Sequence, residues 1–413
     1  MELLGLYDPA DAGWRVESAL ARAEFSYRRA NRETALQWAA IAEVLDEAAT
    51  SPDLYVDPAL PMPAAERRAL AVRAAVADVA VRLSISETVV RLQATDAETL
   101  QRRLPRVWEA LGEGDGSPAH ARTAADLVRS LPDETDANSQ FDGALSAVLS
   151  LAPGRFRTRA RVLRERIHSV SLAERHLSAR ETRSVWIDNC PDGMAQLGLM
   201  LPAELAHQAY ARVDAAAREI AKAPDETRTL AQIRADVAAD LLISGELAEG
   251  LPSARVSVGM MVPMMTALGL SDEPATLDGY GPIDAETARR LAAHAPSFTR
   301  LLTHPVSGAL LDIDRTSYRP PADLKRWLGI TDQTCTFIGC GRLARNSDLD
   351  HTVDRQFGGP TSAANLAHLC RHHHRLKHMT NWKVRSERQG PGRRRVEWTS
   401  PTGHEQAADP PPF

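Results

Sequence analysis

The sequence predicts a mainly α-helical N-terminal domain with small β-hairpins, followed by a small α+β domain with a ββα order of elements. Two observations support this fold class. Over about the first 180 residues, apolar side chains recur at three- and four-residue spacing, which is typical of amphipathic helices. Near the other end, residues 335–378 contain three of the four cysteines and six of the thirteen histidines, a density that packing alone does not explain.

The first helix is predicted from a stripe of residues that share one helical face. This stripe consists of Val16, Leu20, Ala23, Tyr27, Ala30, Thr34, Ile41 and Leu45. A second helix is expected over residues 64–83, because an alanine-rich stretch follows Pro63, a residue suited to the first turn. Pro105, the glycine-rich residues 112–118 and Pro132 then mark connections between helices.

A change of period near Arg183 predicts a β-hairpin. The alternating runs RSVWIDNC and MAQLGLML flank Asp192 and Gly193, and an Asp-Gly pair between two such runs is a strong turn signal. Helical periodicity returns at Pro202 and again over residues 227–243.

The stretch that follows mixes short elements. We expect strands at residues 256–262 and 309–313, a helix at residues 285–294, and a short helix over residues 322–329 after two prolines. This last helix leads directly into the cysteine-rich segment.

Length and composition are those of a globular protein of two or three domains, with 413 residues of which 44% are hydrophobic and 25% charged. The start of the chain does not resemble a signal peptide. The longest apolar stretch, residues 256–270, is interrupted by Gly259 and Pro263 and is too short to cross a membrane. We therefore expect a soluble, cytoplasmic protein with no membrane partner.

Charge is distributed unevenly along the chain. Residues 335–400 contain 12 Lys and Arg against 5 Asp and Glu, a net charge of +7 that leaves −12 for the rest. A basic domain on an acidic carrier indicates a polyanionic partner for that domain, and an arginine-biased solvated surface is the alternative. We predict domains at residues 1–330, with a further division near 250 left open, and at 331–400, followed by a flexible tail at 401–413.

The cysteines form two short-spaced pairs of metal-binding residues. Cys335 and Cys340 are five positions apart, and Cys370 precedes His373 by three. Two such pairs make one tetrahedral site, and zinc prefers sulfur and imidazole donors in closed sites of this kind. We predict a structural Zn2+, which would supply folding energy that a small domain lacks.

Adjacent histidines indicate a second metal centre. His373 and His374 project about 100° apart on a helix, so they do not readily serve one compact site. His374 would face the Asp350-His351 strand as a ligand of a catalytic ion, and His378, on the same helical face, is a secondary candidate.

Asp350 and His351 occur in a short strand-like run, where neighbouring side chains point to opposite faces. A carboxylate suits Mg2+ or Mn2+, and a neutral imidazole suits proton abstraction from water. We expect Asp350 to hold the ion and His351 to act as the base. Asn365, after a Gly-Gly-Pro turn, can either hydrogen-bond the opposite strand and fix the histidine loop or place its carbonyl on the metal.

The motifs D-H, G-G, N-L, L-C and C-x-x-H-H-x-x-K, in this order, resemble the HNH endonuclease family, with His351, Asn365 and His374 at the three named positions. The resemblance implies the ββα-metal fold and cleavage of phosphodiester bonds with a divalent ion. Two departures are His373, where many zinc-containing relatives have Cys, and the wide C-x4-C spacing.

The rest of the chain resembles the helical domain of unknown function 222, which commonly precedes an HNH module. The similar segments are LPRVWEALGEGDGSPAHARTAADLV, PDGMAQLGLMLPAEL, RTLAQIRADVAADLL, LDGYGPIDAETARRLAA, SYRPP and CTFIGC. In the last of these Ile338 stands where Pro is usual. The likeness extends from about residue 15 to 405 and implies an architecture but no chemistry for the larger domain.

These interpretations together predict an endonuclease acting on DNA. His351 would deprotonate a water, and the metal on Asp350 and His374 would stabilise the leaving 3′ oxygen, giving 5′-phosphate and 3′-hydroxyl ends. Basic residues expected to hold DNA phosphates are Arg342, Arg345, Arg355, Arg371, Arg375 and Lys377. One active site per chain predicts nicking, or a homodimer that cuts both strands.

Two other functions stay open. A non-catalytic zinc module that binds nucleic acid would need the four zinc ligands but not Asp350, His351 or His374. Alternatively, the helical domain would be the main functional part, as a scaffold for protein interaction or DNA targeting.

Overall fold

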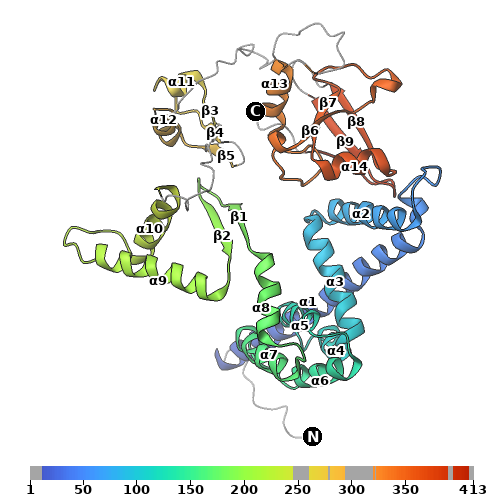
Figure 1. The fold of residues 1–413 in the computed structure, drawn as a ribbon, viewed down its shortest axis with the longest axis vertical. Helices are drawn as coiled ribbons and strands as arrows, with labels where there is room; N and C mark the ends of the chain where they lie inside the picture. Colours follow the sequence, from blue (N-terminus) through green and yellow to red (C-terminus); the bar gives the residue numbers. More distant parts are fainter. Residues whose placement is uncertain are drawn as a thin grey trace. The chain divides into compact units, whose positions relative to one another are not determined.

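A computed structural model describes residues 12–244, 260–277, 280–293, 320, 322–388 and 394–408. The chain divides into two compact units (Figure 1). One comprises Met1–Ser169 with Arg300–Phe413, and the other comprises Val170–Thr299. The predicted division near residue 250 lies outside the described residues. The C-terminal module, residues 322–408, is thus in the same compact unit as the first helices, although the whole of the second unit lies between them in the sequence.

The first unit opens with seven helices, as the apolar spacing predicted. They are α1 (Ala12–Thr50), α2 (Ala64–Leu83), α3 (Glu87–Arg103), α4 (Pro105–Glu113), α5 (Pro118–Arg129), α6 (Thr135–Ser146) and α7 (Pro153–Ile167). Prolines occupy the first turn of α4, α5 and α7, where a missing N–H has no cost. Gly114 ends α4 with φ +87°, a left-handed conformation that glycine adopts without strain.

A hydrophobic core lies between α1 and the helices from α3 to α7. Trp38, Phe141 and Phe156 are fully buried in it. The predicted stripe of α1 packs only in part. Ile41 is buried, but Val16, Leu20 and Tyr27 are more than half exposed. The first buried residue of α1 is Asn31, so the helices of this unit cover the second half of α1 and leave its beginning uncovered.

The second unit contains α8 (Leu172–Ala179), β1 (Ser184–Asn189), β2 (Ala195–Met200), α9 (Ala203–Ile220), α10 (Leu230–Ser244), β3 (Met260–Met261), α11 (Met264–Ala267), β4 (Ala275–Leu277), β5 (Gly281–Ile283) and α12 (Ala285–Ala293). The predicted hairpin is present. β1 and β2 are antiparallel with Trp186 opposite Gly198, and Asp192 and Gly193 both have positive φ at the turn. The helices expected near 203, 227–243 and 285–294 are also confirmed.

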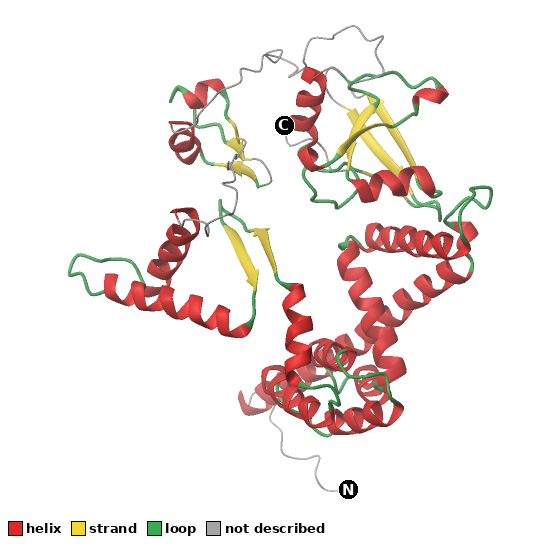
Figure 2. Ribbon diagram, viewed as in Figure 1, coloured by secondary structure: helices red, strands yellow, loops and turns green. Residues whose placement is uncertain are grey.

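The strands are confined to small antiparallel sheets, and helices make up most of the described chain (Figure 2). Of the predicted strand 256–262, only its end is described, as β3, and the predicted strand 309–313 lies outside the described residues. No helix in the described parts of the chain has both the length and the apolar character that a membrane crossing requires.

The C-terminal module contains α13 (Ala322–Asp332), β6 (Asp348–His351), β7 (Leu366–Leu369), α14 (Arg371–Met379), β8 (Lys383–Arg388), β9 (Arg394–Thr399) and β10 (Glu405–Ala407). The predicted ββα order is found in β6, β7 and α14, with Asp350 opposite Ala367 in the antiparallel pair. A second sheet, in the order β10–β9–β8, follows the helix. The segment expected to be a flexible tail therefore differs from its prediction, because residues 405–407 pair with β9.

A continuous apolar cluster joins this module to α2 and the end of α1. Leu70 and Ala74 of α2 belong to the same cluster as Phe337, Trp382 and Trp398 of the module. The indole of Trp382 donates a hydrogen bond to the Ala74 carbonyl at 3.3 Å. The small module thus completes its core with side chains from the helical domain.

Truncation of Trp382 to alanine should destabilise the protein strongly. The indole is 3% exposed, so Trp382→Ala leaves a cavity at the junction and removes the hydrogen bond to Ala74, and we expect a loss of about 3–5 kcal/mol. Trp14, which is 38% exposed, provides the control, and Trp14→Ala should change stability by less than about 0.5 kcal/mol. Urea unfolding of both full-length variants measures the difference, and equal midpoints would contradict a shared core.

Candidate functional site

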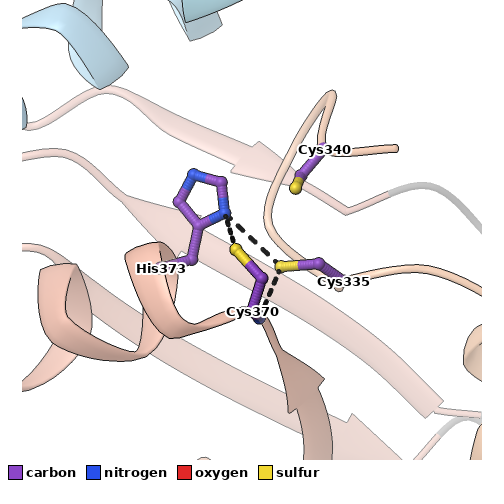
Figure 3. Close-up of side chains that lie close together, drawn as sticks. All are labelled: Cys335, Cys340, Cys370 and His373. Carbon is purple, nitrogen blue, oxygen red and sulfur yellow. Dashed lines mark hydrogen bonds between the residues drawn. The ribbon is translucent and has the colours of Figure 1, made fainter. Parts of the chain in front are cut away.

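The first candidate site is a cluster of three cysteines and one histidine (Figure 3). Cys335 and Cys340 flank a turn in which the Cys340 N–H donates to the Phe337 carbonyl at 3.1 Å and Gly339 has φ +70°. Cys370 precedes the first turn of α14, and His373 lies within that turn. The spacing C-x-x-H therefore brings both side chains to the same end of one helix.

The four ligand atoms all lie within 4.8 Å of one another, so the group could hold a metal ion. His373 Nδ1 is 3.4 Å from Cys335 Sγ and 3.3 Å from Cys370 Sγ. Burial alone would lower the pKa of His373, but hydrogen bonds with Cys340 and Cys370 raise it to about 11. The four predicted ligands are thus brought together.

Glu87, the first residue of α3, contacts the far side of this cluster. Its Oε1 is 2.8 Å from His373 Nε2, and its Oε2 is 3.0 Å from His372 Nε2. Burial alone would raise the pKa of Glu87, but hydrogen bonds with both histidines lower it to about 2. Sequence reasoning missed Glu87, since it lies 286 residues from His373 and no local pattern links them.

The second candidate site is formed by Asp350 of β6 with His374 and His378 of α14. Asp350 Oδ2 is 3.1 Å from His378 Nε2, and Asp350 Oδ1 is 3.7 Å from His374 Nε2. The two imidazole rings are one helical turn apart, with centroids 4.6 Å from each other. His378, predicted as a secondary candidate, lies nearer to the carboxylate than His374 does, and all three could hold one metal ion.

Lys377 holds this carboxylate in place. Its ammonium lies 2.8 Å from Asp350 Oδ2 and 3.0 Å from Asp354 Oδ1, and it also donates to the His351 carbonyl. Burial would raise the pKa of Asp350, but hydrogen bonds with His378 and Lys377 lower it to about 2. The carboxylate is therefore ionised near neutral pH. With a side chain only 8% exposed, Lys377 is not placed for the phosphate contact predicted from its charge.

His351 is the last residue of β6, directly before the loop that leads to β7. Its Nε2 is 3.0 Å from Thr361 Oγ1, across that loop. Burial lowers the pKa of His351, which favours the neutral imidazole. The ring and the Asp350 carboxylate thus have different partners, as expected of neighbours on a strand.

Asn365 fixes the loop. Its Oδ1 accepts from Thr352 Oγ1 at 2.7 Å and from the Val353 N–H at 2.8 Å. Its Nδ2 donates to the carbonyls of Val353 and Pro360, both at 2.9 Å. Of the two roles expected for Asn365, these four bonds favour loop positioning, because its carbonyl already has two donors.

The basic residues predicted for phosphate contact differ in their surroundings. Arg342, Arg345 and Arg355 are exposed, and Arg371 is exposed beside Asp348 at 3.2 Å. Arg375 contacts Glu66 of α2 at 3.4 Å. His368 is a packing residue, since it is 2.9 Å from Asp332 in a buried network that Arg394 completes.

Gly359 lies in the loop between β6 and β7, residues 352–365, at a position with no space for a side chain. A Cβ atom there would lie 1.8 Å from the Val353 carbonyl oxygen and 2.8 Å from Asn365 Nδ2. Gly359→Ala should therefore displace the loop and cost about 1–3 kcal/mol. Gly341, where a Cβ would meet nothing within 4 Å, gives the matched control. Thermal unfolding of the two variants tests the packing, and equal melting temperatures would contradict it.

Comparison with known protein families gives a match to the larger part of the chain. Residues 29–332, about three quarters of its length, match the family described as "Domain of unknown function (DUF222)". The matched span ends before Cys335, so it contains Glu87 but none of the ligands of the two candidate metal sites. No solved structure matches.

Two relatives come from Mycobacterium tuberculosis (strain ATCC 25618 / H37Rv). "Uncharacterized protein Rv3776" is 30% identical over 223 residues, covering 45% of this chain and 41% of that protein. "Uncharacterized protein Rv2100" is 40% identical over 94 residues, covering 22% of this chain and 16% of that protein. The chain thus spans less than half the length of these relatives. With most of its length matched by the family, the chain belongs to the DUF222 family.

Proposed function

We propose that this protein is a metal-dependent endonuclease of the HNH type that hydrolyses phosphodiester bonds in DNA. The observation that carries the proposal is the meeting of Asp350, His374 and His378 on a strand and a helix, with His351 next to the carboxylate in sequence. An oxygen donor with two imidazoles suits a divalent ion that leaves positions open for substrate. Mg2+ or Mn2+ bound there would supply positive charge to a phosphate.

His351 is the proposed general base. Its lowered pKa keeps the imidazole neutral near pH 7, which is the form that accepts a proton from water. Thr361 orients the ring through the contact at Nε2, and Asn365 fixes the loop that carries Thr361. These two residues position the base and do not themselves contact substrate.

Exposed arginines of the C-terminal module are the proposed DNA contacts. Arg342, Arg345, Arg355 and Arg371 can each hold a backbone phosphate, which gives affinity that falls as salt rises. We leave Lys377 out of this set because it is buried against Asp350 and Asp354.

The cysteine cluster is the proposed zinc site. Three thiolates and one imidazole complete a tetrahedral shell with no position left for substrate, which is characteristic of structural zinc. Cys335, Cys370 and His373 are buried, in keeping with a role in folding. Binding energy at this site would support a module whose own core is small.

Nicking of supercoiled plasmid tests the proposed function. With Mg2+ or Mn2+ the protein should nick DNA, and His351→Ala should slow nicking by about 10²–10⁴-fold, because the base is lost. The control is His207→Ala, which removes an exposed histidine of α9 in the other unit. Equal nicking by the wild type and His351→Ala would rule out this mechanism. Metal-independent DNA binding without any nicking would instead favour a non-catalytic zinc module.

Metal content tests the zinc site separately. The purified protein should contain about one zinc ion per chain by mass spectrometry, and Cys370→Ala should contain almost none, because a closed site needs all four ligands. Cys190→Ala, which removes the half-buried cysteine of the hairpin turn, should keep its zinc. Equal zinc contents in the two variants would show that the ion is bound elsewhere.

A further inference from the structure

Both ring nitrogens of His373 have partners from different parts of the chain. Nδ1 faces the thiol groups of the module, at 3.3 Å from Cys370 Sγ. Nε2 faces Glu87 of the helical domain at 2.8 Å. An imidazole that binds metal through one nitrogen commonly donates its other N–H to a carboxylate, which fixes the tautomer and strengthens the ligand.

We propose that Glu87 is a positioning residue of the metal site, through which zinc binding in the C-terminal module is coupled to its docking on the helical domain. The inference rests on the proposed zinc occupancy. It assigns a specific role to the helical domain. Glu87 of α3 is a hydrogen-bond partner of His373, whereas all four candidate zinc ligands belong to the C-terminal module.

The Glu87 carboxylate is held in a defined orientation. It begins α3 directly after Ser86, whose hydroxyl caps the helix by accepting from the Val89 N–H at 3.3 Å. Arg91, one turn further on, forms an ion pair with Glu87 Oε2. The side chain is 16% exposed, so water competes little with the two histidines.

The imidazole of His373 is equally constrained. The ring of Phe337 stacks on it, with centroids 4.0 Å apart and planes 12° from parallel. Phe337 itself belongs to the apolar cluster that joins the module to α2. Stacking fixes the tilt of the imidazole, and Glu87 fixes its rotation in the plane, so that Nδ1 points at the sulfurs.

In a simpler interpretation, Glu87 makes only one of several polar contacts between the C-terminal module and the helices. The contact of Arg375 with Glu66 has that character, because both side chains are 47% exposed and neither touches a ligand. Removal of either carboxylate breaks a bond between the same two parts of the chain. Only Glu87 should change the metal site, which makes Glu66 the matched control.

The zinc affinity of the full-length protein distinguishes the two interpretations. E87Q, which keeps the shape but not the charge, and E87A should bind zinc about 10–100-fold more weakly in competition with a chromogenic chelator. E66Q should bind zinc as the wild type does. Wild-type affinity in a folded E87Q or E87A would overturn the proposal, and should E87A lose its fold, E87Q alone decides.

Cobalt substitution supplies a readout that a merely structural contact would not move. The ligand-field bands of bound Co2+ should shift in E87Q, because a weaker His373 ligand changes the field at the metal, and should be unchanged in E66Q. The same bands in all three proteins would overturn the proposal. A wild-type protein that binds no zinc would instead refute the zinc site itself, so the two failures are distinguishable.

Reciprocity gives a third measurement. If metal binding and docking are coupled, chelation should lower the melting temperature of the wild type by more than it lowers that of E87Q, since coupling acts equally in both directions. An equal decrease in the melting temperature of both proteins would show that Glu87 does not couple metal binding to docking.

Discussion

The geometry of α14 determines how the candidate metal-binding side chains of this protein are divided between two groups. Adjacent residues of a helix project about 100° apart. Consequently His373 turns toward the three cysteines, and His374 turns toward Asp350 on the other side. Nine residues, Arg371–Met379, thus serve two groups of ligands without mixing thiol and carboxylate donors at one ion. Three thiols in one group and a carboxylate in the other would allow the two groups to select different metals.

The apolar cluster at the junction explains why the module lies with the first helices. A ββα unit with one added sheet has too little interior to bury its aromatic side chains alone. Leu70 and Ala74 of α2 share one buried cluster with Trp382 and Phe337, and the same cluster includes Cys335 and Cys370. These candidate metal ligands are therefore enclosed partly by a domain that supplies none of them.

Local sequence signals predicted much of this structure. Pro63 and the alanine-rich run placed α2 at its observed bounds, and Asp192-Gly193 located the hairpin, because turn chemistry and helix starts depend on neighbouring residues. Ligand spacing likewise grouped Cys335, Cys340, Cys370 and His373. Other features depend on contacts between distant segments. Sequence periodicity does not indicate the Glu87 contact, the burial of Lys377 or the exposed start of α1, because tertiary packing determines each of them.

The bond between Trp382 and Ala74 also has a consequence for biosynthesis, because the two residues are 308 positions apart. A ribosome adds roughly 5–20 residues per second, so α2 emerges some 15–60 seconds before the indole that covers it. During this interval its alanine-rich face is open to water and to other nascent chains. The order of synthesis therefore leaves the apolar face of α2 without its partner from the C-terminal module until the last hundred residues have been made.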